Sequence, residues 1–412
     1  MQSWQPKFPK LRGAPLSRPD LSSLFEPFAI KGMVLKSRFV MPGMQRALCV
    51  DGRLLPEMAD YYRRRVEGGV SLVVGEGCCV DHPSSVWESR FPRLNPQTLD
   101  GWERCVEAVH EAGGHMIIQL SHPGALRSDN LALPSMPGPA LSASGLFRAD
   151  KTNGRAATIE ELGEIRDAFA HAAAFVRQIG ADGVELHGCH GFFLDEFLWS
   201  QTNRRDDQYG GATLAERARY PAEVVAAIRA VLGPDLILSF RFSQWKEPDY
   251  EAKVAANPEE LAGLLAILRA AGVDLFHAST RRIDTPEWPG SDLGLAGWAK
   301  RATDAPVIAV GSVGLTVDVM ESLIGTAEAR FAGEASLREL KRRFDRGDFD
   351  LVAVGRSLIA DPNWPLKVRD GRYGDIRRFR KSDLGEALEM EPELVIEAHR
   401  EPHHLLEEGD HP

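Results

Sequence analysis

Short runs of apolar residues alternate along the chain with longer segments of helical periodicity. This alternation is typical of parallel strands that are connected by helices. It predicts eight strands, at residues 38–44, 70–77, 115–120, 183–188, 236–243, 275–280, 306–311 and 351–356. Eight such strands favour an α/β fold of the closed (β/α)8 TIM-barrel type over an open sheet.

Four of the connecting segments are long and amphipathic, which predicts helices at 56–68, 99–112, 159–179 and 214–232. Two of these helices begin with a capping box, Thr158 with Glu161 and Thr213 with Glu216. An open dinucleotide-binding sheet would require the motif G-x-G-x-x-G after the first strand. The sequence at 41–45 is MPGMQ, so this alternative is disfavoured.

Two segments are longer than ordinary barrel loops. Residues 123–157 are rich in proline, serine and glycine, which predicts either an inserted lid or hairpin over the barrel mouth or a variable surface loop. Residues 325–348 are charged and helical in pattern, which predicts an exterior element. We therefore expect one barrel domain at 24–375, with an N-terminal extension at 1–23 and an acidic C-terminal tail at 376–412.

The chain has 412 residues and a net charge of −10. Ten acidic residues and one arginine lie within 383–412, so the rest of the chain is nearly neutral and predicts no binding of nucleic acid or an anionic membrane. No apolar run reaches the roughly 18 residues of a membrane span, and the start resembles no signal peptide. Five cysteines without a C-x-x-C motif predict free thiols. We expect a cytoplasmic enzyme with small-molecule ligands, as a single chain or a homo-oligomer.

Ligands of TIM barrels bind at the carboxyl ends of the strands, so the residues at which the apolar runs stop are candidate site residues. The ends of the last two strands predict a phosphate site, in which Gly311, Ser312 and Gly355 supply backbone amides and Arg356 supplies a guanidinium group. The alternative is that the glycines only turn the chain and that Arg356 pairs with an acidic residue.

Two further strand ends carry polar side chains. Gln119 ends the third run, and its paired donor and acceptor suit the imide edge of a planar heterocycle. Arg241 ends the fifth run, where a deeply placed charge requires an anionic or polar partner. Together with the phosphate site, they indicate a pocket for a phosphorylated planar heterocycle that becomes negatively charged in use.

His187 and His190 follow the fourth strand and are close enough to converge on one oxygen atom or one metal ion. A catalytic zinc site uses at least three protein ligands, and no third ligand pattern stands out, so we expect no metal. Two imidazole N–H groups directed at a carbonyl oxygen are the favoured interpretation. A structural histidine pair and a metal-dependent lyase or hydrolase are the alternatives.

The stretches VELHGCHGFFLDEFL at 184–198 and NRRDDQYGG at 203–211 resemble the old yellow enzyme family of FMN-dependent barrel oxidoreductases. The resemblance extends over roughly residues 24–375, with supporting matches LFEP at 24–27, QLSH at 119–122, FRFS at 240–243 and VGR at 354–356.

The resemblance implies that FMN lies across the barrel mouth. The implied contacts of its ring and phosphate are Pro42, Gly43, Met44, Gln45, Gly77, Gln119, Arg241, Gly311, Ser312, Gly355 and Arg356. Among these, Gln119 would bond the pyrimidine edge, and Arg241 would lie near the N1 and O2 side, where reduction deposits negative charge. His187 and His190 would bind the carbonyl oxygen of the substrate.

The resemblance further implies a ping-pong reaction, in which NADPH or NADH reduces FMN and hydride then passes to the β-carbon of an α,β-unsaturated carbonyl or related electrophilic compound. Because the chain has no clustered cysteines for an iron–sulfur centre, we expect FMN as the only redox cofactor. Two positions depart from the family pattern. Gln45 replaces a common threonine or cysteine, and Phe192 replaces the usual tyrosine proton donor. Since phenylalanine has no proton to donate, a non-catalytic flavin-binding protein is a further alternative.

Overall fold

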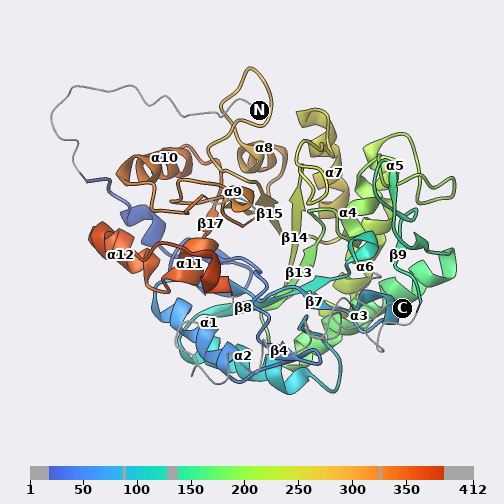
Figure 1. The fold of residues 1–412 in the computed structure, drawn as a ribbon, viewed down its shortest axis with the longest axis horizontal. Helices are drawn as coiled ribbons and strands as arrows, with labels where there is room; N and C mark the ends of the chain where they lie inside the picture. Colours follow the sequence, from blue (N-terminus) through green and yellow to red (C-terminus); the bar gives the residue numbers. More distant parts are fainter. Residues whose placement is uncertain (1–17, 87–89, 128–137, 324–326, 385–412) are drawn as a thin grey trace, which may run out of the picture.

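The computed structural model describes residues 18–86, 90–127, 138–323 and 327–384, and within them eight parallel strands form a closed barrel surrounded by helices (Figure 1). The strands are β3 (Phe39–Met41), β6 (Leu72–Val74), β8 (His115–Ser121), β13 (Gly183–His187), β14 (Ile237–Ser243), β15 (Leu275–Ser279), β16 (Val307–Val310) and β17 (Leu351–Ala353). Each pairs with the next in this order, and β17 pairs with β3 to close the ring. The predicted (β/α)8 barrel is confirmed.

The main helices around the barrel are α1 (Glu57–Glu67), α2 (Leu99–Glu111), α3 (Ile159–Gln178), α6 (Arg219–Leu232), α7 (Pro258–Ala271), α8 (Leu295–Ala302), α10 (Glu334–Asp345) and α12 (Trp364–Asp370). Shorter helices are α4 (Phe193–Leu198), α5 (Leu214–Arg217), α9 (Val319–Leu323) and α11 (Arg356–Ala360). Both predicted capping boxes are present, at Thr158 and Thr213.

Several strands are shorter than predicted, and two predicted elements differ in kind from the observed ones. The helix predicted at 214–232 is divided at Ala218 into α5 and α6. Pro221 lacks the N–H group that would bond one turn back into α5, and it is tolerated only because it lies in the first turn of α6. The strand predicted at 351–356 ends earlier, and Arg356 begins α11 instead.

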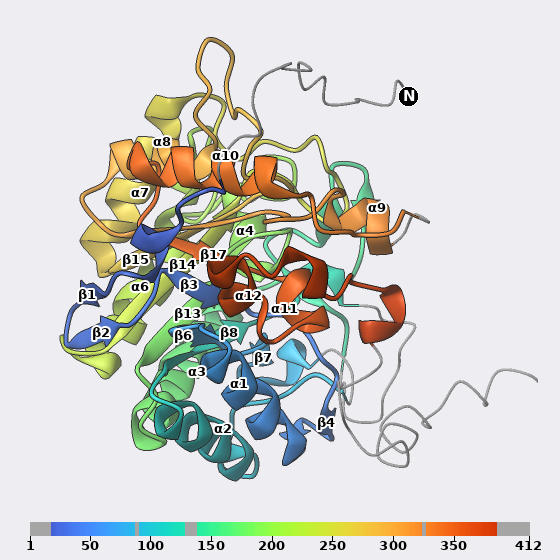
Figure 2. The same cartoon turned by 90° about the vertical axis from the view of Figure 1, so that its left-hand side faces the viewer.

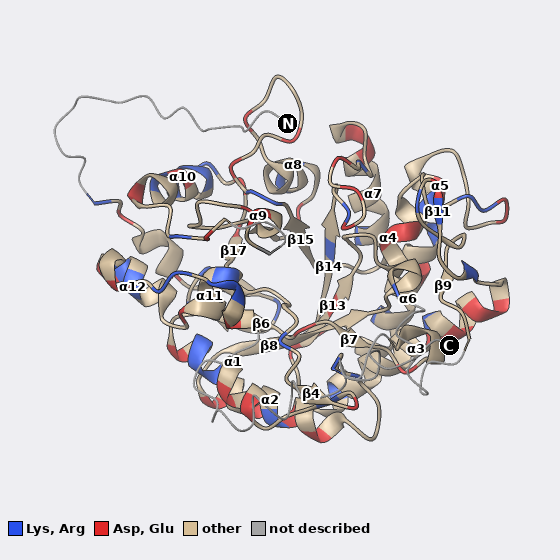
Figure 3. Cartoon of the chain, in the orientation of Figure 1, with Lys and Arg blue, Asp and Glu red and all other residues tan. Residues whose placement is uncertain are grey.

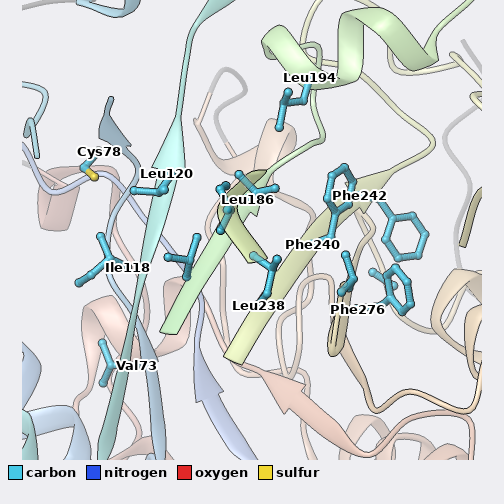
Figure 4. Packing of buried hydrophobic residues seen from close by; sticks show 14 of the residues in the cluster. Val73, Cys78, Ile118, Leu120, Leu186, Leu194, Leu238, Phe240, Phe242 and Phe276 are labelled. Carbon is cyan, nitrogen blue, oxygen red and sulfur yellow. The ribbon is translucent and has the colours of Figure 1, made fainter. Parts of the chain in front are cut away.

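The core has two layers. Inside the barrel, one cluster joins strand residues such as Val40 and Ile237 to a hairpin formed by β1 (Phe28–Ile30) and β2 (Met33–Leu35). Figure 2 shows this hairpin at the left edge of the molecule, away from α9 and α11. The second layer lies between the strands and the helices, and Figure 4 shows Val73, Ile118 and Leu186 in it. The pattern of apolar runs did not predict the hairpin.

The two insertions differ in structure. Residues 138–157 contain the short strands β9 (Leu141–Ser142), β10 (Leu146–Arg148), β11 (Lys151–Thr152) and β12 (Arg155–Ala156), while 128–137 lie outside the described residues. The second insertion contains the predicted exterior helix, α10. Three further short strands are β4 (Cys49–Val50), β5 (Arg53–Leu54) and β7 (Cys78–Cys79).

Charged residues lie mostly on the outer helices and loops, and few interrupt the central strands (Figure 3). Of the predicted acidic tail, residues 376–384 are described, and Phe379 within them is buried; the remainder lies outside the described residues. Within the described part of the chain, no helix combines the length and apolarity that crossing a membrane requires.

Candidate functional site

Strand register places the predicted site residues side by side at the carboxyl ends of the barrel strands. His187 at the end of β13 pairs in register with Arg241 of β14, and Arg241 pairs with His277 of β15. On the other side of β13, Glu185 pairs with Gln119 of β8. Residues from four separate segments of the sequence therefore meet at one end of the barrel.

His190 has a backbone conformation that is uncommon for a residue with a side chain. Its φ of 65° lies in the left-handed region, which costs a non-glycine residue roughly 1 kcal/mol or more. Two hydrogen bonds hold it there: its N–H donates to Ser243 Oγ at 3.0 Å, and its carbonyl oxygen accepts from the N–H of Glu247 at 2.9 Å. This turn directs the imidazole of His190 towards that of His187.

The two imidazoles approach through their inner nitrogens, His187 Nε2 and His190 Nδ1, which are 3.4 Å apart. Each outer nitrogen lies near a hydroxyl group, His187 Nδ1 at 3.3 Å from Ser121 Oγ and His190 Nε2 at 2.9 Å from Ser279 Oγ. Arg241 donates to Ser279 Oγ at 3.2 Å, so the serine hydrogen is free to be donated to His190.

The two serines favour one pair of imidazole tautomers. If each serine donates to an outer nitrogen, both imidazole hydrogens reside on the inner nitrogens. Burial, with the positive charge of Arg241 as a second cause, lowers the pKa of His187 to about 3 and the pKa of His190 well below its usual value. The pair is therefore neutral at physiological pH and offers two N–H groups to one acceptor.

Glu185 connects the site residues beneath the histidines. One of its carboxylate oxygens accepts from Gln119 Nε2 at 2.8 Å, and the other accepts from Ser239 Oγ and His277 Nδ1, both at 2.9 Å. Burial by itself would raise the pKa of Glu185, but His277, Arg241 and the bond from Gln119 bring the pKa to about 2. The resulting carboxylate orients the amide of Gln119.

Phe192 lies where the sequence analysis placed it, directly against the histidines. Its ring stacks on His187 with a centroid distance of 3.9 Å and an interplanar angle of 28°. The side chain is buried, since the residue is 6% exposed. An aromatic ring at this position packs the site but provides no acidic proton.

Gly43 and Gly77 pack closely against the Gln119 amide, and this stretch of bare backbone beside Gln119 is called the slot below. A Cβ atom on Gly43 would lie 2.9 Å from the carbonyl oxygen of Gly75 and 3.0 Å from the Gln119 amide, and one on Gly77 would lie 3.1 Å from Gln119 Oε1. Side chains at Gly43 and Gly77 would therefore collide with the amide. Bare backbone at these positions allows a flat ring to approach closely.

Gly355 packs against two further predicted ring contacts, since its Cβ atom would lie 3.4 Å from Met44 Sδ and 3.9 Å from Pro42 Cγ. Two buried donors nearby have no hydrogen-bond partner within the described residues, Arg241 Nε and Gln45 Nε2. Unpaired buried donors are costly, and a ligand with several acceptor atoms would satisfy both. Arg241 NH1 also donates to the carbonyl oxygen of Gly43 at 3.3 Å, which links it to the slot. These residues fit a flavin ring.

The predicted phosphate residues also lie together, but the guanidinium of Arg356 is largely engaged by the protein. Its NH1 and NH2 groups donate to Ser312 Oγ, Ser322 Oγ and the carbonyl oxygens of Val317 and Asp318. The hydroxyl of Ser312 donates to the carbonyl oxygen of Arg281 at 2.6 Å, and its φ of 50° is left-handed. Arg356 thus orders the loop after β16, and the amides of Ser312, Gly355 and Arg356 remain for an anion.

A cavity of about 450 Å³ adjoins His190. Two of its lining residues contact that histidine: Ser279 by the hydrogen bond described above, and Trp245 by ring packing at a centroid distance of 4.4 Å. Tyr250 and Arg281 form another part of the wall, with the guanidinium 5.2 Å from the phenol ring. The volume is that of a small-molecule site.

Two contributors were not identified from the sequence. Glu185 could have been found, because it is a charge in the middle of an otherwise apolar strand. Ser279 carries no such signal, because a serine at a strand end is common. Their roles depend on the proximity of β13, β14 and β15 in the barrel.

The alternative of a metal centre has one observation in its favour. His187, Cys189 and His190 each have a ligating atom within 4.8 Å of those of the other two. Burial, however, raises the pKa of the Cys189 thiol well above its usual value, and the thiolate is the form that binds metals. The two serines bonded to the outer histidine nitrogens agree better with an oxygen-binding pair.

The sequence of this chain is similar to those of known flavin-dependent oxidoreductases. The model of the NADH:flavin oxidoreductase / NADH oxidase family matches residues 23–328. An NADH oxidase of Thermoanaerobacter brockii is 32% identical over 88% of this chain, and the chain spans only 53% of that relative. An NADPH dehydrogenase of Halalkalibacterium halodurans is 27% identical over 84% of this chain and 93% of its own length.

A solved structure of morphinone reductase in complex with tetrahydroNAD superposes with a TM-score of 0.68 at 25% identity, covering 85% of this chain and 91% of that protein. This likeness and the family match agree with the slot, the two unpaired donors and the paired histidines. The chain belongs to the NADH:flavin oxidoreductase / NADH oxidase family, that of old yellow enzyme, whose cofactor is FMN.

Proposed function

We propose that this chain is an FMN-dependent NAD(P)H oxidoreductase that reduces the carbon–carbon double bond of α,β-unsaturated carbonyl or related electrophilic compounds. The observation that carries the proposal is the 3.4 Å separation of His187 Nε2 and His190 Nδ1, with a serine on each outer nitrogen. Two N–H donors that converge on one point stabilise the negative charge that develops on a carbonyl oxygen. The names of the relatives, NADH oxidase and NADPH dehydrogenase, support a nicotinamide as the reductant.

FMN, when bound, supplies a redox centre that takes up a hydride and passes it on. We assign its ring to the slot beside Gln119 and its phosphate to the amides of Ser312, Gly355 and Arg356. Within the described residues these three amides make no hydrogen bond. The positive charge of Arg241 at the slot favours a ligand that gains negative charge.

The remaining chemical role is that of the proton donor. Phe192 holds the ring of His187 in place but cannot protonate the α-carbon. The cavity that adjoins His190 is large enough for both substrate and water, and we assign protonation to a water molecule in it. The compartment is part of the proposal: the five cysteines are buried and none forms a disulfide, which supports a reducing compartment such as the cytosol.

An anaerobic visible spectrum of the purified protein tests this function. The flavin absorbance should bleach when NADPH or NADH is added and should return when cyclohexenone follows. Bleaching by one nicotinamide only would identify the preferred donor. A flavin that neither nicotinamide reduces would favour a non-catalytic flavin-binding protein.

The alternative hypothesis, a metal-dependent lyase or hydrolase, predicts a different result for the same purified protein. It requires a bound metal and no flavin absorbance, so metal analysis of the same sample separates the two hypotheses. A flavin that is reduced by nicotinamide and reoxidised only by oxygen would overturn the choice of substrate but keep the redox function.

A further inference from the structure

Two histidines and one aspartate meet at the amino-terminal end of the barrel strands, the opposite end from the site described above. His110 lies in the last turn of α2, His115 is the first residue of β8, and Asp182 immediately precedes β13. Their ligating atoms all lie within 4.8 Å of one another. We propose that these three side chains form a binding site for a divalent transition metal ion such as Zn²⁺.

The distances suit one ion with two imidazole nitrogens and a carboxylate. His110 Nε2 lies 2.8 Å from Asp182 Oδ2, and His115 Nδ1 lies 2.9 Å from Asp182 Oδ1. Zinc binds such nitrogen and oxygen atoms at about 2.0–2.2 Å, which places the ligand atoms of a tetrahedral site roughly 3.3 Å apart. The two nitrogen–oxygen separations therefore need to widen by about half an ångström to admit the ion, and the two imidazole nitrogens already lie within 4.8 Å of each other.

The carboxylate is held rigidly before any ion binds. Asp182 Oδ2 accepts from the N–H of Met116 at 2.7 Å, and the N–H of Asp182 donates to the carbonyl oxygen of Met116 at 2.8 Å. The parallel pairing of β13 with β8 begins at the next residues, where Gly183 pairs in register with Ile117, so Asp182 and Met116 are fixed relative to each other. Hydrogen bonds that orient a metal-binding carboxylate are typical of metal sites and strengthen them.

The site is open to solvent and attracts positive charge. The side chains of His110, His115 and Asp182 are 38%, 26% and 16% exposed, so an ion can enter and keep water as a further ligand. His110 lies near the carbonyl end of α2, where the helix dipole favours a cation.

This inference does not depend on the proposed function, because no residue of this site contributes to the histidine pair or to the flavin slot. A metal at this position would join α2 to β8 and β13. It would therefore stabilise the folded chain without taking part in the redox reaction.

Calorimetric titration of the metal-free holoprotein with ZnCl₂ tests the site. We expect one saturable zinc ion per chain, with at least about tenfold weaker binding in His110→Gln and in His115→Gln. His171→Gln changes an exposed histidine on α3 and should leave the zinc affinity unchanged. His190→Gln should also leave it unchanged, which separates this site from the group of His187, Cys189 and His190.

A thermal melt gives a readout that does not depend on the heat of binding. Zinc should raise the melting temperature of the wild type and of His171→Gln but not that of His110→Gln or His115→Gln. Melting of these variants without zinc establishes that they fold. Wild-type affinity in both His110→Gln and His115→Gln, absence of saturable zinc binding, or loss of binding in His190→Gln alone would overturn the proposal.

Discussion

His190 Nε2 lies 2.9 Å from the hydroxyl oxygen of Ser279, although 89 positions separate the two residues in the sequence. Arg241 donates to the same oxygen, which leaves the hydroxyl hydrogen of Ser279 available for His190 Nε2; in that arrangement the imidazole hydrogen of His190 resides on Nδ1, the nitrogen that faces His187. Ser279 is in this way a positioning residue for the proposed oxygen-binding pair.

Ser279→Ala should weaken the binding of phenol-type ligands about fivefold, since loss of one hydrogen bond is worth about 1 kcal/mol. The cause is that the imidazole of His190 then adopts either tautomer. A visible titration of the flavin band measures the affinity. Ser142→Ala is a matched control, because Ser142 is similarly buried and its hydroxyl accepts from the N–H of Gly145 within its own turn. Equal ligand affinity in Ser279→Ala and wild type would refute this role.

Phe192→Tyr should accelerate reoxidation of the reduced protein by cyclohexenone about tenfold or more, because a phenol at this position adds a general acid. Reduction by the nicotinamide should keep its rate, since that step needs no proton from this side chain. Stopped-flow absorbance separates the two half-reactions. Phe192→Leu removes the stacking on His187 without adding a donor and should give no acceleration. If Phe192→Tyr and Phe192→Leu are reoxidised by cyclohexenone at the same rate, a phenol at this position adds no proton donor. The assignment of water as the proton source then loses its support.

Glu76 makes the stability of the protein depend on pH. Burial raises the pKa of this carboxyl to about 7 from its usual 4.5. A raised carboxyl pKa means that the folded state prefers the protonated form, so stability is highest below about pH 4.5 and falls as pH rises to about 7.

Between about pH 5 and pH 8, the free energy of unfolding of the wild type should fall by roughly 3 kcal/mol relative to that of Glu76→Gln. Urea denaturation at both pH values measures this difference. Glu103→Gln changes an exposed side chain on α2 and should track the wild type at both pH values. A difference between wild type and Glu76→Gln that stays constant with pH would contradict the raised pKa.

Lys246 and Asp195 form a buried ion pair next to the His190 turn. Lys246 Nζ lies 2.7 Å from Asp195 Oδ1, the two side chains are 0% and 1% exposed, and Asp195 also accepts from the N–H of Gly191. Lys246→Met should lower the free energy of unfolding by about 3–5 kcal/mol, because it leaves a buried carboxylate without its cation.

The double variant Lys246→Met with Asp195→Asn should recover part of that loss, since no charge is then left unpaired. Chemical denaturation measures both variants. A double variant less stable than Lys246→Met would show that Asp195 matters through its bond to Gly191 and not through its charge.

The barrel and its family could be predicted from the sequence because both depend on local patterns. Apolar runs at eight positions and the capping boxes at Thr158 and Thr213 specify elements through short-range periodicity, and all eight strands are observed. The continuous stretch at 184–198 carries the family resemblance. The β1–β2 hairpin was not predicted, because it lies outside the alternation of strands and helices from which the eight strands were inferred.

The sequence by itself determined the fold class, the family and the approximate set of site residues, since these follow from residue types at strand ends. Only the tertiary structure decided which atoms meet. It turned Arg356 towards the loop after β16, joined Glu185 to Gln119, and set Ser279 against His190. The physical reason is that these contacts link segments far apart in the sequence, and barrel closure and strand register bring them within hydrogen-bond distance.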